Sequence, residues 1–264
     1  SPEFYSNAEH AVEGIKQEYE AAREVVKKPE RIAKLRDSKP VEITGKEIKL
    51  TGDEKQDKKA ALEYGKTLQG SYVNADTGNT IQLQRGRKNG GVNEVLQHNY
   101  KDAAHLQSVA AIPEIIKKSI LISTEENKDQ NKNPNVAEYQ HFVCGLKIGG
   151  EDYTVHALVA VDNSGNRYYD HNLVQIEKGK LLDHISGKAV IEGFGTTPST
   201  KLTTNSERKV NTLLSILQIN PEEIAQAEAR MREIEELRQG VRFFKTRDGE
   251  AYGFTLNGEI HIDP

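Results

Sequence analysis

Three β-strand patterns joined by tight-turn residues constrain the fold of this 264-residue chain more than any other feature. Apolar and polar side chains alternate in HFVCGLKI, DYTVHALVAVD and NRYYDHNLVQI, as in strands with one face on a core. Gly149-Gly150 and the NSGN run at 163–166 suit hairpin turns, which predicts an antiparallel meander. Helical patterns at 93–108 and 113–118 precede the strands, so the sequence predicts an α+β fold with helices packed on an antiparallel sheet.

The regions around a central domain at 39–186 predict separate elements. Residues 1–38 predict one or two helices with a break at Pro29, and the first four residues resemble a cloning remnant. Residues 187–240 predict a linker and then a helix that starts at an Asn-Pro-Glu-Glu sequence. Residues 241–264 predict hairpins that begin a further, truncated domain.

Shorter patterns inside the central domain predict its remaining elements. VEITGKEIKL at 41–50 predicts a hairpin, and residues 53–68 predict a helix. A second hairpin is expected around the turn at 76–79, and EENKDQNKNPN at 125–135 is expected to be an exposed loop because it carries no apolar core residue.

Composition excludes several classes of protein. Charged residues make up 29% of the chain, and no apolar run approaches the roughly 20 residues needed to span a bilayer, so no membrane association is expected. The net charge of -4 argues against a protein that coats nucleic acid by neutralising many phosphates. The single cysteine, Cys144, excludes an internal disulfide, favours a cytoplasmic location and sits in an apolar register that predicts a core position.

Six of the eight histidines lie between Gln97 and Ser186, and this clustering favours proton transfer because imidazole titrates near neutral pH. The alternative is that these are polar residues on solvated helix and strand faces. The predicted acid-base residues are His98, His105, His141, Tyr169 and His171. The predicted phosphate-binding residues are Arg85, Arg87, Lys101 and Lys147.

A metal or cofactor site is not predicted. The chain contains no HExxH sequence and no Cys/His pair at a zinc spacing, and its Gly-rich run at 86–91 lacks the order of a phosphate loop. No GxSxG sequence supports a covalent hydrolase.

Two long runs of the sequence resemble domains of very large polyvalent proteins. These runs are HNYKDAAHLQSVAAIPEIIKKSILI and YQHFVCGLKIGGEDYTVHALVAVDNSGNRYYDHNL, and the resemblance covers roughly residues 40 to 185. Such proteins belong to phages and conjugative elements, particularly those of Bacteroides-type bacteria. Several of their domains are assigned to the superfamily of barnase, EndoU, colicin and RelE nucleases.

The resemblance implies a curved sheet behind helices and a toxin-like, metal-independent endoribonuclease that uses the 2′-hydroxyl of RNA as nucleophile. It places an early histidine at His98 or His105 and late residues at Tyr169 and His171. The C-terminal strands also resemble the first strands of a zinc metallopeptidase-like domain whose HExxH would lie beyond Pro264.

The sequence thus predicts an RNA-cleaving domain, with RNA as the partner. The first alternative is a non-catalytic module that binds protein or nucleic acid, with protein partners on the terminal helices. Group transfer from a nucleotide such as NAD is a further alternative.

Overall fold

The computed structural model describes residues 2–83, 103–127, 131, 133–169, 174–186, 216–245, 252–256 and 259–263. The chain divides into two compact units, residues 29–218 and a smaller unit of residues 1–28 with 219–264. Helices and antiparallel strands are both present, which confirms the α+β class.

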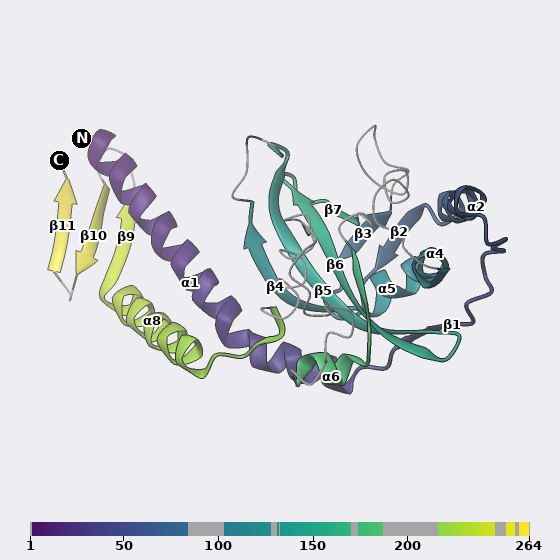
Figure 1. Ribbon diagram of the computed structural model, residues 1–264. Helices are drawn as coiled ribbons and strands as arrows, with labels where there is room; N and C mark the ends of the chain where they lie inside the picture. Colours follow the sequence, from purple (N-terminus) through teal and green to yellow (C-terminus); the bar gives the residue numbers. More distant parts are fainter. Residues whose placement is uncertain are drawn as a thin grey trace, which may run out of the picture. The chain divides into compact units, whose positions relative to one another are not determined.

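A strongly curved sheet forms the larger unit (Figure 1). In the described residues its order is β1-β5-β6-β7-β3-β2, with β4 paired to β5 and β8 paired to β6. The strands are β1 (Val41–Ile43), β2 (Gly70–Val73), β3 (Thr80–Leu83), β4 (Ile120–Glu126), β5 (Val136–Ile148), β6 (Glu151–Asp162), β7 (Arg167–Tyr169) and β8 (Gln175–Lys178).

The predicted meander is confirmed for β5, β6 and β7, which pair antiparallel in this order. Gly149 and Gly150 both have positive φ, at 58° and 91°, so the two-residue turn uses the conformational freedom of glycine. The third predicted strand is two strands: β7 pairs with β6 at 159–161, and β8 pairs with it at 153–156.

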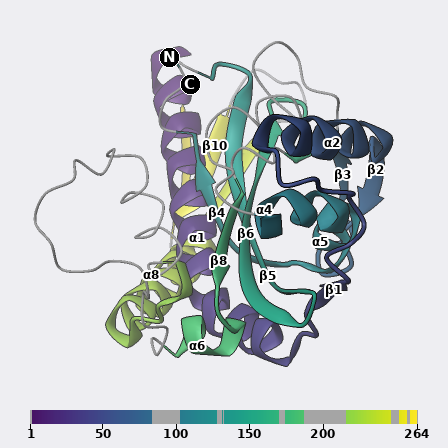
Figure 2. The ribbon, with the colours of Figure 1, turned by 45° about the vertical axis from the view of Figure 1, so that its right-hand side comes forward.

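Helices cover one face of the sheet (Figure 2). Helices α2 (Glu54–Thr67), α4 (Ala103–Ser108) and α5 (Ile112–Lys118) pack with the 3-10 turn η1 (Val109–Ala111) over the apolar side chains of β5 and β6. The predicted helix at 53–68 is confirmed, and the Asp53 side chain caps it by accepting from the Gln56 N–H.

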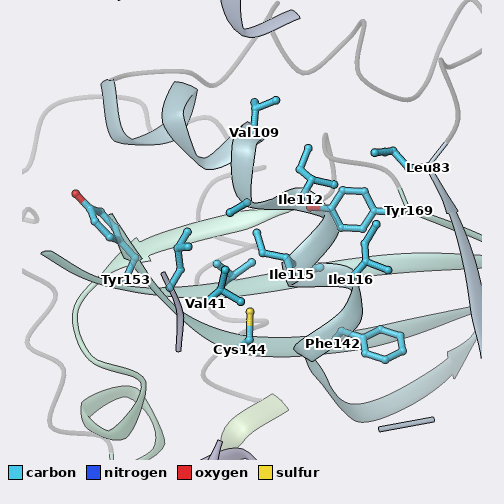
Figure 3. Close-up of a cluster of buried hydrophobic side chains, with 14 of the residues drawn as sticks. Val41, Leu83, Val109, Ile112, Ile115, Ile116, Phe142, Cys144, Tyr153 and Tyr169 are labelled. Atoms are coloured by element: carbon cyan, nitrogen blue, oxygen red, sulfur yellow. The ribbon is translucent and has the colours of Figure 1, made fainter. Parts of the chain in front are cut away.

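The core under these helices contains Cys144 and Tyr169 (Figure 3). Cys144 is 1% exposed, and burial raises its pKa to about 12, which confirms the predicted core position.

The opposite face of the sheet packs against the end of α1 (Pro2–Asp37) and against α6 (Leu181–Ile185). Ile32 and Leu35 of α1 pack with Val143 of β5 and Leu181 of α6. The register of β4 against β5 shifts between Leu121 and Ser123, and Arg31 of α1 donates to the Ile122 carbonyl between them.

Two predictions for this unit are wrong. VEITGKEIKL is not a hairpin: β1 pairs parallel with β5, and Ile48 instead exchanges both backbone hydrogen bonds with the Gln107 side chain. The loop predicted at 125–135 starts later, because Glu125 and Glu126 belong to β4. Asn127 is buried there, and its amide donates to the Asn133 and Val136 carbonyls.

In the smaller unit, residues 2–28 of α1 accompany helix α8 (Pro221–Gly240) and a sheet of order β11-β10-β9. The strands β9 (Val241–Lys245), β10 (Tyr252–Leu256) and β11 (Glu259–Asp263) confirm the C-terminal strand predictions. The Asn220 side chain accepts from the Glu222 and Glu223 N–H groups, as predicted for the start of α8. Helix α1 continues through Pro29, so the predicted break is absent, although the two units divide at this residue.

Candidate functional site

Two buried histidines form a hydrogen-bonded pair on the sheet face opposite the main core. His141 of β5 and His156 of β6 are each 4% exposed. Val143 lies directly opposite His156, so the two histidines are diagonal neighbours on one face. This face also carries Leu158, the partner of His141.

The two imidazoles meet edge to edge. Their planes differ by 10° and their centroids are 5.2 Å apart, while Nδ1 of His141 lies 2.9 Å from Nε2 of His156. Nearly parallel rings whose nitrogens are this much closer than their centroids share a hydrogen bond in the ring plane. The tautomer of one imidazole therefore determines which nitrogen of the other imidazole carries its proton.

A carboxylate and an amide extend the pair at its two ends. Nε2 of His141 lies 3.3 Å from Oε1 of Glu125 on β4, whose side chain is 57% exposed. Nδ1 of His156 lies 3.2 Å from Oε1 of Gln175 on β8. The result is a chain of four polar side chains across four strands, Glu125-His141-His156-Gln175, which we call the histidine relay.

Burial keeps both imidazoles of the relay neutral at pH 7. Desolvation lowers the pKa of His141 and outweighs the attraction of Glu125, which acts in the opposite direction. Desolvation and the neighbouring His141 lower the pKa of His156 to about 4, although its bond to Gln175 acts to raise it. Neutral imidazoles each hold one N–H and one lone pair, so both can donate and accept.

A third buried histidine lies close to the relay. His184 of α6 has Nδ1 3.8 Å from Oε2 of Glu177, which is two residues beyond Gln175 on β8. Desolvation lowers the pKa of His184 and raises the pKa of Glu177. Within the described part of the chain, Nε2 of His184 has no hydrogen-bond partner.

The structure separates several of the predicted site residues. Tyr169 is 3% exposed and packs in the core under the helices, near Ile112 and Ile116 (Figure 3). It therefore lies on the opposite face of the sheet from His141. Lys147 shares the face of His141 but is six residues further along β5, about 20 Å in an extended strand.

The other predicted residues are placed only in part. His105 lies in α4, among the helices on the core face. His98, His171, Lys101, Arg85 and Arg87 lie outside the described residues. Their predicted roles stay predictions.

Sequence reasoning missed His156, Glu125 and Gln175. His156 could have been found, because a two-residue turn at Gly149-Gly150 pairs Ile148 with Glu151 and hence Val143 with His156. Glu125 and Gln175 were harder to place, because one follows the register shift in β4 and the other begins a strand that was not separately expected.

Two further observations concern the described residues alone. No group of three or more His, Cys, Asp or Glu side chains lies there in a position to hold a metal ion. No helix in those ranges has the length and apolar character to cross a membrane.

Comparison with known families finds a match for the centre of the chain. Residues 51–169 match the family described as large polyvalent protein-associated domain 3. This span runs from three residues before α2 to the end of β7 and is just under half of the chain. It contains Glu125, His141 and His156 of the relay, while Gln175 lies beyond it.

The match supports the predicted similarity to polyvalent protein-associated domains over this span. It does not extend to the nuclease superfamily, which stays a prediction. No curated protein matches the chain. No solved structure matches it either.

Proposed function

We propose that the larger unit is a metal-independent RNA-cleaving domain of a polyvalent protein, in which the histidine relay performs general acid-base catalysis. The observation that carries the proposal is the bonded chain from the exposed Glu125 carboxylate to two buried imidazoles. The contact with His141 holds the Glu125 carboxylate in one orientation, in which it can take up a proton.

RNA suits such a site because it carries its own nucleophile. Glu125, as the exposed end of the relay, would take the proton of the 2′-hydroxyl while the bond from O2′ to phosphorus forms. The bond from phosphorus to O5′ then breaks, and an acid must protonate the leaving oxygen. His98 and His171, which lie outside the described residues, are our candidates for that acid.

The proposal is tested with the full chain, RNA and EDTA. We expect the wild-type protein to cleave, and Glu125→Gln and His141→Gln each to reduce the rate by about 100-fold or more, as for other general acid-base groups. Glu126→Gln is the matched control, because this neighbour lies on the same exposed end of β4 but outside the relay. The proposal would be refuted if Glu125→Gln cleaved RNA at the wild-type rate, or if the wild-type protein did not cleave RNA.

A second candidate function is a non-catalytic module that binds protein or nucleic acid. The observation in its favour is the burial of both imidazoles, together with the distance between His141 and Lys147 along β5. Intact RNA that remains bound to the protein would favour this second function.

A further inference from the structure

The relay ends on Gln175, a side chain that can either donate or accept a hydrogen bond. In the structure its amide oxygen Oε1 faces Nδ1 of His156, and a half-turn about the last side-chain bond would present the NH₂ group instead. Every other member of the relay must adapt to this choice, because each neutral imidazole has one N–H and one lone pair.

With the amide oxygen facing His156, the hydrogen bonds run inward. Nδ1–H of His156 donates to Gln175, and Nδ1–H of His141 donates to Nε2 of His156. Nε2 of His141 is then a lone pair that faces the Glu125 carboxylate at 3.3 Å. Two acceptors at this distance require one added proton between them.

With the amide NH₂ facing His156, every hydrogen bond runs outward. Nε2–H of His156 donates to His141, and Nε2–H of His141 donates to Glu125. This state needs no added proton and leaves Glu125 a free carboxylate base. The two states therefore differ by one proton at the Glu125 end and by the orientation of Gln175 at the other.

We infer that Gln175 is a positioning residue that sets the hydrogen-bond direction of the relay and thereby decides whether Glu125 is ready to accept a proton. The catalytic part of this inference rests on the proposed function. The part about hydrogen-bond direction stands on the geometry of the four side chains alone.

The variants at position 175 leave the other ionisable groups near the relay unsubstituted. Glu177 of β8 and His184 of α6 lie on the Gln175 side, and Arg31 of α1 donates to the carbonyl of Ile122 in β4. A variant at position 175 alters none of these groups directly.

Gln175→Leu and Gln175→Glu together test the inference, because leucine removes the acceptor whereas a carboxylate accepts and cannot donate. We expect ¹⁵N NMR of the full chain at pH 7 to show His156 protonated at Nδ1 in the wild-type protein, because Oε1 of Gln175 faces this nitrogen, and to show the same tautomer in Gln175→Glu. Gln175→Leu removes the acceptor of this bond, so His156 should shift towards the Nε2 tautomer, which donates to Nδ1 of His141 instead. Glu177→Gln is the matched control on the same strand and should leave the His156 tautomer as in the wild type.

The pH profile of RNA cleavage provides the second readout. In Gln175→Glu the added proton is held more firmly, so the acidic limb of the profile should move up by at least about one pH unit. An unchanged His156 tautomer in Gln175→Leu would overturn the inference. A switched tautomer in a protein that cleaves no RNA would leave the hydrogen-bond role of Gln175 standing and refute the proposed function.

Discussion

Acid should destabilise the larger unit through His156, and the size of the effect follows from its burial. The pKa of His156 falls from 6.5 to about 4 in the folded protein. A folded pKa below the unfolded one means that the unfolded chain binds the proton first as the pH falls. The stability contributed by the neutral imidazole is therefore complete above pH 6.5 and is lost as the pH falls towards 4.

The loss is large enough to measure. Each pH unit between the two pKa values corresponds to about 1.4 kcal/mol, so lowering the pH from 7 to 4.5 should cost about 2–3 kcal/mol through His156. The depressed pKa of His141 acts in the same direction. His156→Gln keeps a polar side chain at this position but does not titrate, so it should lack this part of the loss.

Cys144 provides the assay. It is the single cysteine of the chain and is buried between the sheet and its helices, so its labelling requires the core to open. Where labelling follows the opening equilibrium, 2–3 kcal/mol corresponds to a labelling rate about 30- to 150-fold higher. The measurement compares wild type with His156→Gln at each pH, so that the pH dependence of the reagent and of the carboxylates cancels.

His105→Gln is the control, because it also removes one histidine but on the helical face of the unit. The labelling rate of Cys144 in His105→Gln should depend on pH in the same way as in the wild-type protein. Parallel pH profiles for wild type and His156→Gln would refute the assignment of a depressed pKa to this imidazole.

Two further predictions concern the stability of the larger unit, measured by urea unfolding of the full chain. Gly165→Ala and Gly179→Ala both place a side chain at positive φ, which costs about 1–2 kcal/mol, but only at Gly179 does the added Cβ meet an atom, Nε2 of His184 at 3.1 Å. We expect Gly179→Ala to be the more destabilising of the two, and equal losses would refute the contact. Asn74→Ala should cost about 2–3 kcal/mol, because the buried Asn74 amide donates to the Ile116 and Ser119 carbonyls. Asn79→Ala is the control and should stay within about 0.5 kcal/mol of wild type, so similar losses for the two variants would contradict this role.

The sequence predicted the meander because its turn residues leave few choices. Gly149-Gly150 imposes a two-residue turn, and the alternation in the strands on both sides then fixes which residues face the core. The same reasoning failed at residues 41–50, because the partner of Ile48 is the side chain of Gln107, from a helix distant in the sequence. A local pattern cannot distinguish a strand partner from a side chain that offers the same hydrogen bonds.

The candidate site was predicted less well, because both faces of its third strand are polar. Arg167 and Tyr169 alternate with Tyr168, and neither set is clearly apolar, so the pattern does not indicate which face meets the core. Pairing with Val159 places Tyr169 on the core face, away from His141. The register of the first hairpin, by contrast, already contained the contact between His141 and His156.

The position of the relay also bears on why it exists. The face that carries it adjoins an apolar cluster that includes Val143, Ile122 and Leu217, so apolar side chains at 141 and 156 would extend existing packing. Two imidazoles there have depressed pKa values and therefore reduce stability at acid pH. Replacing buried polar partners together by apolar side chains of similar shape is often neutral or stabilising, so packing alone does not require this pair. An exposed carboxylate at one end and a reversible amide at the other supply what a proton-transfer site needs, and this supports a functional origin of the relay.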